Sequence, residues 1–559
     1  MDLFEVGRGK VRLDTSDFLA QGGEAAVYVK GDRAYKVYHD PTKMVPAGKL
    51  QELSVLNHAA LVRPEAVLLD RKDLPVGYAM RRITAAHVLC ELFNRAFRDR
   101  KAVSADAVLA LVRKLQAGVQ HVHERDVLIV DLNEMNFLLD PTLQEIHFID
   151  VDSYQTNSFP ATAIMDSVRD RHAATFSRET DWFSFAVVAF QMFTGIHPFK
   201  GKHPVLKDLD ARMRANVSVL NSEVKVPAVC QPFSVIPPAY LAWFKAVFEA
   251  GERNAPPDAR SAPVLVAPEL HLLTSSDRLR VRELYRFTTP VLLPLPAAGP
   301  HTALTQDGLQ VRGVRHPVPA DARVVVTPRM LQPVAAWIET GALVLYDVGR
   351  KCRITAEIAA EGLTAYADRL YVKQGQSLAT IDLLELPAGI RATPRPVANV
   401  MEHATRLFDG AALQDVLGSC WVTLFPQPGH TYSIRLLELD GARVVDARFD
   451  GGVLIVVAFR NGRYDRLVFR FGVGYSDYDL RVTEDVTPAE LNFVTLDSGV
   501  CVLLTETGEL ELFRRDKGSA GVRLVSGVGI DDVRLFRNGS QVLGVRGETL
   551  YELSLRLGT

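Results

Sequence analysis

The second half of the chain repeats a short pattern of strand, tight turn and strand. Three such units begin at Gly452, Phe493 and Leu535, about 41 to 42 residues apart. β-branched and aromatic residues fill the predicted strands, and Gly, Asp or Asn marks the turns between them. A chain that repeats this pattern can bury its apolar residues only by packing successive antiparallel units against one another, so residues 286–559 predict an all-β domain.

The length of the repeat narrows the fold of this domain. A period of about 40–45 residues built from short antiparallel strands is typical of the blades of a β-propeller. At that period, residues 286–559 would hold about six blades. The units before Gly452 are less regular, and a β-sandwich therefore stays open as the alternative.

The chain changes character near residue 285. Before it, apolar residues recur at a helical period over 108–123, and the run 181–195 is almost entirely apolar, as in a helix buried on all sides. Predicted strands alternate with these helices, which favours a separate α+β domain over residues 1–262. The charged segment 263–285 lies between the two domains and predicts a helical linker.

Charge and composition argue against several function classes. The 64 Lys and Arg residues nearly balance the 66 Asp and Glu residues, which leaves no broad basic surface for nucleic acid or an anionic membrane. No stretch approaches the ~18 apolar residues of a membrane span, and the N-terminus lacks the apolar core of a signal peptide. We therefore expect a cytoplasmic protein that binds neither nucleic acid nor a membrane.

Two features near the N-terminus suit the binding of phosphate groups. Gly22 and Gly23 lie in a predicted turn between strands, where glycine lets backbone N–H groups approach phosphate oxygens closely. Lys36 follows on an apolar strand, where an ammonium group needs a partner or a route to solvent. Glu52, in the helical run 48–56, is the candidate partner. Taken singly, a glycine hairpin and two surface charges explain these residues equally well.

Three polar residues follow at a fixed spacing. Asp131 and Asn136 lie in HERDVLIVDLNEMNFLL, over 123–139, and Asp150 lies 14 residues after Asn136, in IHFIDVDSY. A carboxylate where a strand ends, combined with an asparagine, supplies the oxygen ligands that Mg²⁺ prefers. Each of these residues alone is also common in turns. Together with Lys36 they supply the groups that phosphoryl transfer from ATP requires, namely a lysine for the phosphates, oxygen ligands for Mg²⁺ and a carboxylate that faces the acceptor hydroxyl.

Together these segments resemble a eukaryotic-type Ser/Thr protein kinase domain over about 250 residues. The turn 19–28 is similar to the family's glycine-rich loop, the run 34–38 to its VAIK strand, and 123–139 to its catalytic loop. The resemblance implies a bilobal kinase-like domain, with an N-lobe over about 1–83 and a C-lobe over about 84–262. It also implies that the protein binds ATP together with Mg²⁺ or Mn²⁺.

The resemblance implies a role for each matching residue. Asp131 would be the catalytic aspartate that faces a Ser or Thr hydroxyl, and Lys36 would bind phosphates while paired with Glu52. Asn136 and Asp150 would hold the metal ion. The residues expected to line the nucleotide pocket are Gly22, Gly23, Val27, Lys36 and Met80.

Several positions depart from the family pattern. Ile129 and Val130 replace the His and Arg before the catalytic aspartate, and Asn133 replaces a Lys that follows it. Asp152 stands two residues after Asp150, where it either adds a second carboxylate near the metal or caps a turn. Asp181, in ETDWFSFA, is expected to hold the catalytic-loop backbone. These losses leave a nucleotide-binding pseudokinase scaffold as the alternative to an active kinase.

The pattern as a whole is similar to a divergent bacterial branch of kinase-like proteins that acts in signalling. This resemblance implies a protein substrate and, as partners, a PP2C phosphatase and a von Willebrand A-domain protein. The second half shows no paired carboxylates, His cluster or nucleophile motif. We expect it to dock a partner or substrate, or to cover and regulate the first half.

Overall fold

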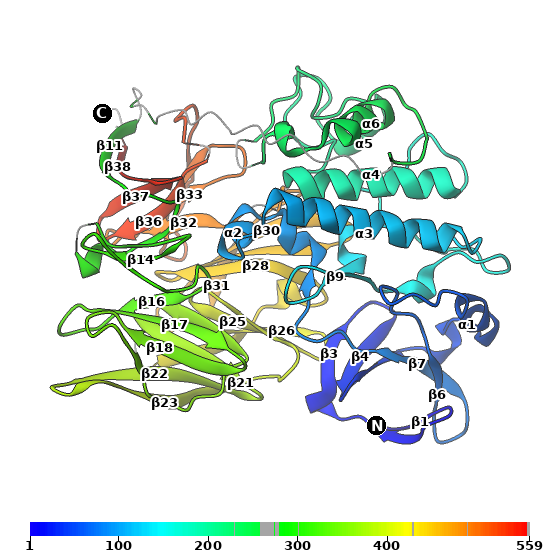
Figure 1. The fold of residues 1–559 in the computed structure, drawn as a ribbon, viewed down its shortest axis with the longest axis horizontal. Helices are drawn as coiled ribbons and strands as arrows, with labels where there is room; N and C mark the ends of the chain where they lie inside the picture. The colour runs from blue at the N-terminus through cyan, green and yellow to red at the C-terminus, as the bar shows by residue number, and fades with distance from the viewer. Residues whose placement is uncertain are drawn as a thin grey trace.

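The computed structural model describes residues 1–227, 230–257, 273, 275, 279–299, 301–427, 430–488, 490–530 and 532–555. In these residues β-strands greatly outnumber α-helices, and the sheets are antiparallel. One sheet lies at the lower right of Figure 1, the helices lie above it, and a second group of sheets lies at the left. None of the described helices combines the length and the apolar character that crossing a lipid bilayer requires.

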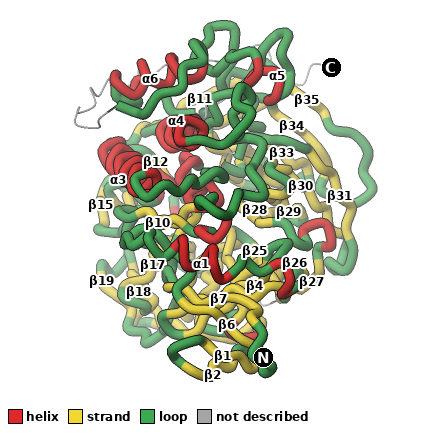
Figure 2. Tube along the Cα trace, turned by 90° about the vertical axis from the view of Figure 1, so that its right-hand side faces the viewer, coloured by secondary structure: helices red, strands yellow, loops and turns green. Residues whose placement is uncertain are grey.

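The N-terminal residues form a seven-stranded sheet in the order β2-β1-β6-β7-β5-β4-β3. Its strands are β1 (Asp2–Glu5), β2 (Gly9–Arg12), β3 (Phe18–Gln21), β4 (Ala25–Lys30), β5 (Arg33–Tyr38), β6 (Ala66–Leu69) and β7 (Pro75–Arg81). Strands β5 and β7 approach closely at Gly77, where a Cβ atom would lie 2.1 Å from the carbonyl oxygen of Lys36. This pairing places Tyr78 directly opposite Lys36. Helix α1 (Ala47–Leu53) lies above β4 and β7 in Figure 2.

The other helices form a layer beside a small sheet of β10-β9-β8. Helices α3 and α4 pack against each other, as Figures 1 and 2 show. Helix α4 is buried almost all round because its residues are nearly all apolar, as the sequence predicted. The elements are β8 (His87–Val88), α2 (Arg95–Arg100), α3 (Ala105–His123), β9 (Phe137–Leu139), β10 (Ile146–Phe148), α4 (Arg178–Thr194), α5 (Leu209–Arg214) and α6 (Pro238–Phe248).

The rest of the described chain forms seven four-stranded antiparallel sheets. The first six follow the chain order: β12 (Val291–Pro294), β13 (Ala303–Thr305), β14 (Gly308–Val311), β15 (Val314–His316); β16 (Arg323–Val326), β17 (Pro333–Glu339), β18 (Ala342–Asp347), β19 (Cys352–Ile354); β20 (Gly362–Tyr366), β21 (Arg369–Gln374), β22 (Ser377–Leu386), β23 (Gly389–Asn399); β24 (Thr405–Phe408), β25 (Ala411–Val416), β26 (Ser419–Gln427), β27 (His430–Arg435); β28 (Arg443–Asp450), β29 (Val453–Arg460), β30 (Arg463–Phe471), β31 (Tyr478–Thr483); β32 (Asn492–Thr495), β33 (Val500–Leu504), β34 (Leu510–Arg514), β35 (Arg523–Val525). The seventh combines β36 (Arg534–Asn538), β37 (Gln541–Arg546) and β38 (Thr549–Leu555) with β11 (Leu279–Arg286) from the start of this region.

Each of these sheets shares a cluster of buried apolar residues with the next sheet along the chain. The seventh sheet shares one with the first, through Leu543 and Val545 against Val291 and Ala303. The pairing of β11 with β38 joins the beginning of this region to its end. The sheets therefore form a closed succession, in contrast to the two facing sheets of a β-sandwich.

Two expectations from the sequence need correction. The predicted helical linker, 263–285, includes residues that form strand β11, and most of its remainder lies outside the described residues. The charged side chains of β11 are largely exposed, and its partner β38 is about 270 residues away, so no local pattern could indicate the pairing. The expected count of about six units is one short of the seven four-stranded sheets. That count assumed a period of 40–45 residues throughout, whereas the first two of these sheets begin only 32 residues apart, at Val291 and Arg323.

The two halves of the chain meet through a buried contact. Tyr464 on β30 donates a hydrogen bond to Glu134 Oε1 at 2.6 Å, and Arg443 on β28 donates to the carbonyl oxygen of Met135 at 3.3 Å. Val445 and Phe459 pack against the core of the helical layer. More exposed polar contacts between the halves join Arg82 to His403, Glu91 to Arg406, and Lys200 to Asp485.

Candidate functional site

Lys36 lies at the centre of a cluster of charged side chains. Its Nζ atom donates to Asp150 Oδ1 and to Asp152 Oδ2, each at 2.8 Å, and Tyr38 donates to the same Asp152 oxygen at 2.9 Å. Burial works to lower the pKa of Lys36, but Tyr78, Asp152 and Asp150 outweigh it and raise that pKa well above the usual value. Lys36 is therefore held as a cation against two carboxylates.

The two carboxylates of this cluster differ in their surroundings. The Asp152 side chain is 5% exposed, and although burial works to raise its pKa, the charge of Lys36 and hydrogen bonds from Lys36 and Tyr38 hold the pKa below the usual value. The Asp150 side chain is 40% exposed, and its partial burial together with the charge of Asp152 raises its pKa. Asp150 is thus the carboxylate that is open to a ligand.

The predicted ion pair between Lys36 and Glu52 is absent from the described residues. Helix α1 buries Lys49 and Leu53, which lie one turn apart, and this orientation turns Glu52 away from Lys36. The Glu52 carboxylate accepts instead from the backbone N–H of Ser158 at 3.2 Å. Asp152 takes the place that was expected for Glu52. It caps no turn, and the turn-capping interpretation of Asp152 is wrong.

The loop that carries Asp131 brings two more predicted residues to the cluster. Asn136 donates through Nδ2 to the carbonyl oxygen of Asp131 at 2.9 Å and to its Oδ2 atom at 3.3 Å. The other carboxylate oxygen, Oδ1, accepts from the backbone N–H of Met165 at 2.8 Å. The backbone of Asn136 accepts from Ile149 N, which fixes the loop beside Asp150. Asp131, Asn136, Asp150 and Lys36 thus converge from distant parts of the chain.

Asp181 holds the backbone of this loop in place, as predicted from the sequence. Its side chain is completely buried and accepts from the N–H groups of Ile129 and Val130, each at 2.8 Å, and from His123 Nε2 at 2.9 Å. Val130 has φ 64°, a left-handed conformation that is unfavourable for a β-branched residue. Asp150 also has a positive φ, 59°. Such strain tends to concentrate at functional sites and persists only where the surroundings enforce it.

The residues expected to line a nucleotide pocket all lie on the N-terminal sheet. Gly22 and Gly23 form the turn between β3 and β4, and a Cβ atom at Gly23 would meet no atom within 4 Å. Val27 on β4 pairs with Lys36 on β5, and Met80 lies on the next strand, β7. Both apolar side chains are only partly buried. The sheet therefore presents a glycine turn and two partly exposed apolar side chains around Lys36.

The contact between the loop 131–136 and the second half leaves a buried carboxylate that is only partly satisfied. Glu134 is 2% exposed, and its Oε2 atom has no hydrogen-bond partner, while Oε1 accepts from Tyr464. Burial raises the pKa of Glu134. A single hydrogen bond from β30 therefore supports a buried acid between Asp131 and Asn136.

Replacing Tyr464 with Phe tests this support. We expect the free energy of unfolding to fall by about 1–3 kcal/mol, because both oxygens of Glu134 would then be buried without a donor. The matched control is Tyr432→Phe, since Tyr432 lies on β27 with its ring 5.0 Å from that of Tyr475, and its hydroxyl bonds to none of the described residues. Equal stability of the two variants in chemical unfolding would contradict the support that we assign to Tyr464.

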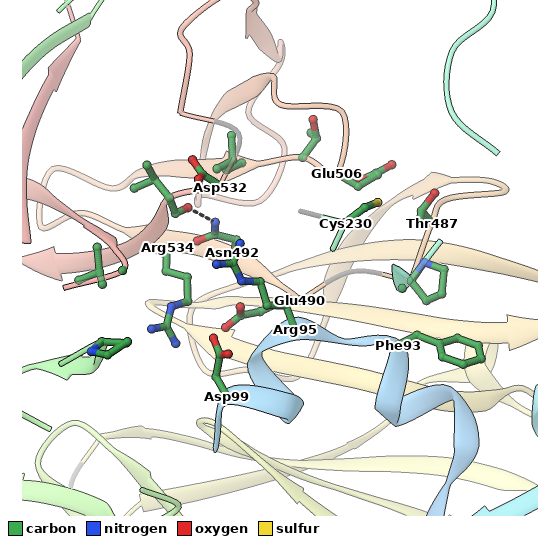
Figure 3. Close-up of a pocket in the computed structure, with 18 of the residues that line it drawn as sticks. Phe93, Arg95, Asp99, Cys230, Thr487, Glu490, Asn492, Glu506, Asp532 and Arg534 are labelled. Atoms are coloured by element: carbon green, nitrogen blue, oxygen red, sulfur yellow. Dashed lines mark hydrogen bonds between the residues drawn. The ribbon is translucent and has the colours of Figure 1, made fainter. Parts of the chain in front are cut away.

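A cavity of about 210 Å³ lies apart from the Lys36 cluster. It lies between α2 and the part of the second half where its first and last sheets meet. Figure 3 shows Arg95 and Asp99 of α2 near Glu490 and Arg534. Asn492 donates to the carbonyl oxygen of Val533 there, at 2.7 Å. None of the residues predicted from the sequence lines this cavity.

Comparison with known proteins gives a distant similarity to protein kinases. A probable serine/threonine-protein kinase of Dictyostelium discoideum is 22% identical over 197 residues, which is 33% of this chain and 14% of that protein. The serine/threonine/tyrosine-protein kinase HT1 of Arabidopsis thaliana is 25% identical over 141 residues, which is 24% of this chain and 35% of HT1. No family model matches the chain. The chain is therefore similar to Ser/Thr protein kinases at low identity and over part of their lengths.

Three residues of the site were not assigned a role from the sequence. Lys49 lies on the buried face of α1, and Glu134 and Tyr464 connect the loop 131–136 to the second half. Periodicity within 48–56 could have pointed to Lys49, because Lys49 and Leu53 share a helix face. No local signal links Glu134 to Tyr464, since they are 330 residues apart.

Proposed function

We propose that the protein is a protein kinase that transfers the γ-phosphoryl group of ATP to Ser or Thr hydroxyls of a protein substrate. The observation that carries this proposal is that two bonded pairs, Lys36 with Asp150 and Asn136 with Asp131, lie on neighbouring segments that the hydrogen bond from Ile149 N to the Asn136 carbonyl oxygen joins. A lysine, a carboxylate for the acceptor hydroxyl and two oxygen ligands are the groups that this reaction needs. The distant kinase similarity agrees with this proposal.

The residues present suit a nucleotide with Mg²⁺ or Mn²⁺. The partly exposed carboxylate of Asp150 and the amide oxygen of Asn136, whose Nδ2 is already used, are hard oxygen donors of the kind that Mg²⁺ prefers. Lys36 would bind phosphates, and the turn at Gly22 and Gly23 would cover them. The bound metal would neutralise charge that develops on the phosphates during transfer. Asp131 would orient the acceptor hydroxyl.

The architecture supports two domains within this proposal. Residues 1–262 would form a bilobal kinase-like domain, with the sheet of residues 1–83 as the N-lobe and the helical layer of residues 84–262 as the C-lobe. Residues 279–555 would form a β-propeller of seven blades. In support, seven sheets of four strands share buried clusters in a closed succession, and β11 with β38 joins the ends.

The second half would support the catalytic loop as well as dock partners. Its buried hydrogen bond to Glu134 favours the covering and regulating role among the expectations. Deleting the second half would therefore disturb the site itself and would not isolate docking. In the bacterial signalling setting that the resemblance implies, a PP2C phosphatase and a von Willebrand A-domain protein remain the proposed partners. Co-purification with each of them tests this.

The function is tested by transfer of labelled γ-phosphate from ATP to the purified full chain and to proteins of a cell lysate, with Mg²⁺ or Mn²⁺. We expect labelled protein. Binding of ATP without transfer would support a nucleotide-binding pseudokinase scaffold instead. Absence of ATP binding would contradict both functions.

The corrected position of Glu52 gives a second test of the site. Replacing Glu52 with Gln should leave ATP affinity within about 2-fold of the wild type, because Glu52 bonds to Ser158 and not to Lys36. Replacing Asp152 with Asn should change the affinity more, since Asp152 contacts Lys36 directly. Titration calorimetry with ATP and Mg²⁺ measures both. A larger effect at Glu52 would restore the original prediction.

A further inference from the structure

Helix α1 directs a lysine into the charged cluster and leaves it without a close partner. Lys49 is 6% exposed, and within the described residues it makes no hydrogen bond and no ion pair through its side chain. Helix α1 packs against the turn Val151–Ser153, and Asp152 and Asp150 act on Lys49 electrostatically. Burial lowers the pKa of Lys49, and these two carboxylates oppose the shift.

Asp152, which is charged oppositely to Lys49, has a carboxylate oxygen without a hydrogen-bond partner. Its Oδ2 atom accepts from both Lys36 and Tyr38, whereas its Oδ1 atom is buried and has no hydrogen-bond partner. A buried carboxylate oxygen without a partner is costly, and its place beside a largely buried lysine that also lacks a partner needs an explanation. The ammonium group of a lysine that is 6% exposed and one buried carboxylate oxygen are thus both available for a further contact.

The charges of the cluster indicate in which state a contact between Lys49 and Asp152 would stabilise the site. Lys36 and Lys49 carry two positive charges, and Asp150 and Asp152 carry two negative charges. In the nucleotide-bound site proposed above, Lys36 turns toward the phosphates and Asp150 toward the metal. Asp152 then loses the ion pair with Lys36 that it has in this structure, although it stays buried. A buried carboxylate that loses its partner is strongly destabilising.

We propose that Lys49 is the partner of Asp152 in the state that binds a magnesium nucleoside polyphosphate. By taking over Asp152, Lys49 frees Lys36 to bind the phosphates. Lys49 is thus a positioning residue that acts through Asp152. The proposal rests on the proposed nucleotide-binding function, and it explains why α1 directs a lysine inward where a glutamate was expected.

The test measures binding of Mg–ADP and of adenosine to the full chain by titration calorimetry. We expect Lys49→Met to weaken Mg–ADP binding about 10-fold, because Asp152 would compete for Lys36. Adenosine, which has no phosphate to draw Lys36 away, should bind within about 2-fold of the wild type. In an Asp152→Asn background, Lys49→Met should weaken Mg–ADP binding by less than about 2-fold. Lys43→Met, at an exposed lysine just before α1, is the matched control and should bind like the wild type.

Thermal unfolding without ligand gives a readout that a merely structural lysine would not share. Because Lys49 is buried without a close partner, Lys49→Met should raise the unfolding midpoint by about 2 °C. A lowered midpoint would overturn the inference, as would unchanged Mg–ADP affinity or an equal loss of affinity in the Asp152→Asn background. If the wild type binds neither Mg–ADP nor Mg–ATP, the proposed function itself fails.

Discussion

Replacing Asp131 with Asn should lower phosphate transfer by about 10²–10⁴-fold while ATP affinity stays within about 2-fold. Asp131 would act on the acceptor hydroxyl and not on the nucleotide, so its charge matters for the reaction rather than for binding. One of its oxygens accepts from Met165 N and the other lies near Asn136 Nδ2, contacts that an Asn at this position would keep in part. The loss would then be chemical and not structural.

The comparison needs transfer rates and ATP affinity for the same preparations. Asp126→Asn is the matched control, because Asp126 lies five residues earlier, is exposed and, in the part of the chain that the structure describes, forms an ion pair with Arg178 alone. We expect the control to transfer phosphate like the wild type. Equal rates for Asp131→Asn and the wild type would remove Asp131 from the reaction. A parallel loss of ATP binding would point instead to a disrupted loop.

Replacing Asp181 with Ala should destabilise the helical layer by at least about 3–5 kcal/mol. The carboxylate is fully buried and satisfies the N–H groups of Ile129 and Val130 together with His123. Alanine would leave these donors buried without acceptors. It would also release the strained backbone at Val130, so that Asp131 would no longer be held in place.

Chemical unfolding followed by the helical circular dichroism signal measures this effect. Asp166→Ala is the control, since the Asp166 side chain is 82% exposed and its nearest cation, Arg171, is 3.7 Å away. The control should unfold like the wild type. Wild-type stability of Asp181→Ala would show that the loop does not depend on the buried carboxylate.

The sequence predicted most of the candidate site because those residues depend on local spacing. Asp131, Asn136 and Asp150 lie within 20 residues, and each is placed by a short loop or by the end of a strand. The α+β character of the first half and the β character of the second half followed from hydrophobic periods. These features are properties of contiguous segments, which a sequence displays directly.

What the sequence did not predict depends on the rotation of one helix and on contacts between distant segments. Glu52 and Lys49 are three residues apart on α1, and burial of Leu53 decides which of them faces Lys36. Strand β11 pairs with β38, which lies at the other end of the second half in the sequence. Without that partner in view, the charged residues of β11 resembled a linker. Tyr464 reaches Glu134 only because the sheet β28–β31 packs against the core of the helical layer. Such outcomes are set by tertiary packing, which overrides local preference.

The hydrogen bond from Tyr464 to Glu134 also bears on how this chain could be inherited. A change at either position alone would strand a buried polar group, so related proteins should vary the two positions together. The two halves would then be inherited as one unit. Fusions that exchange the second half for that of a distant relative should fold less stably unless residue 464 still donates a hydrogen bond. Covariation of positions 134 and 464 would therefore identify the proteins that share this contact between the two halves.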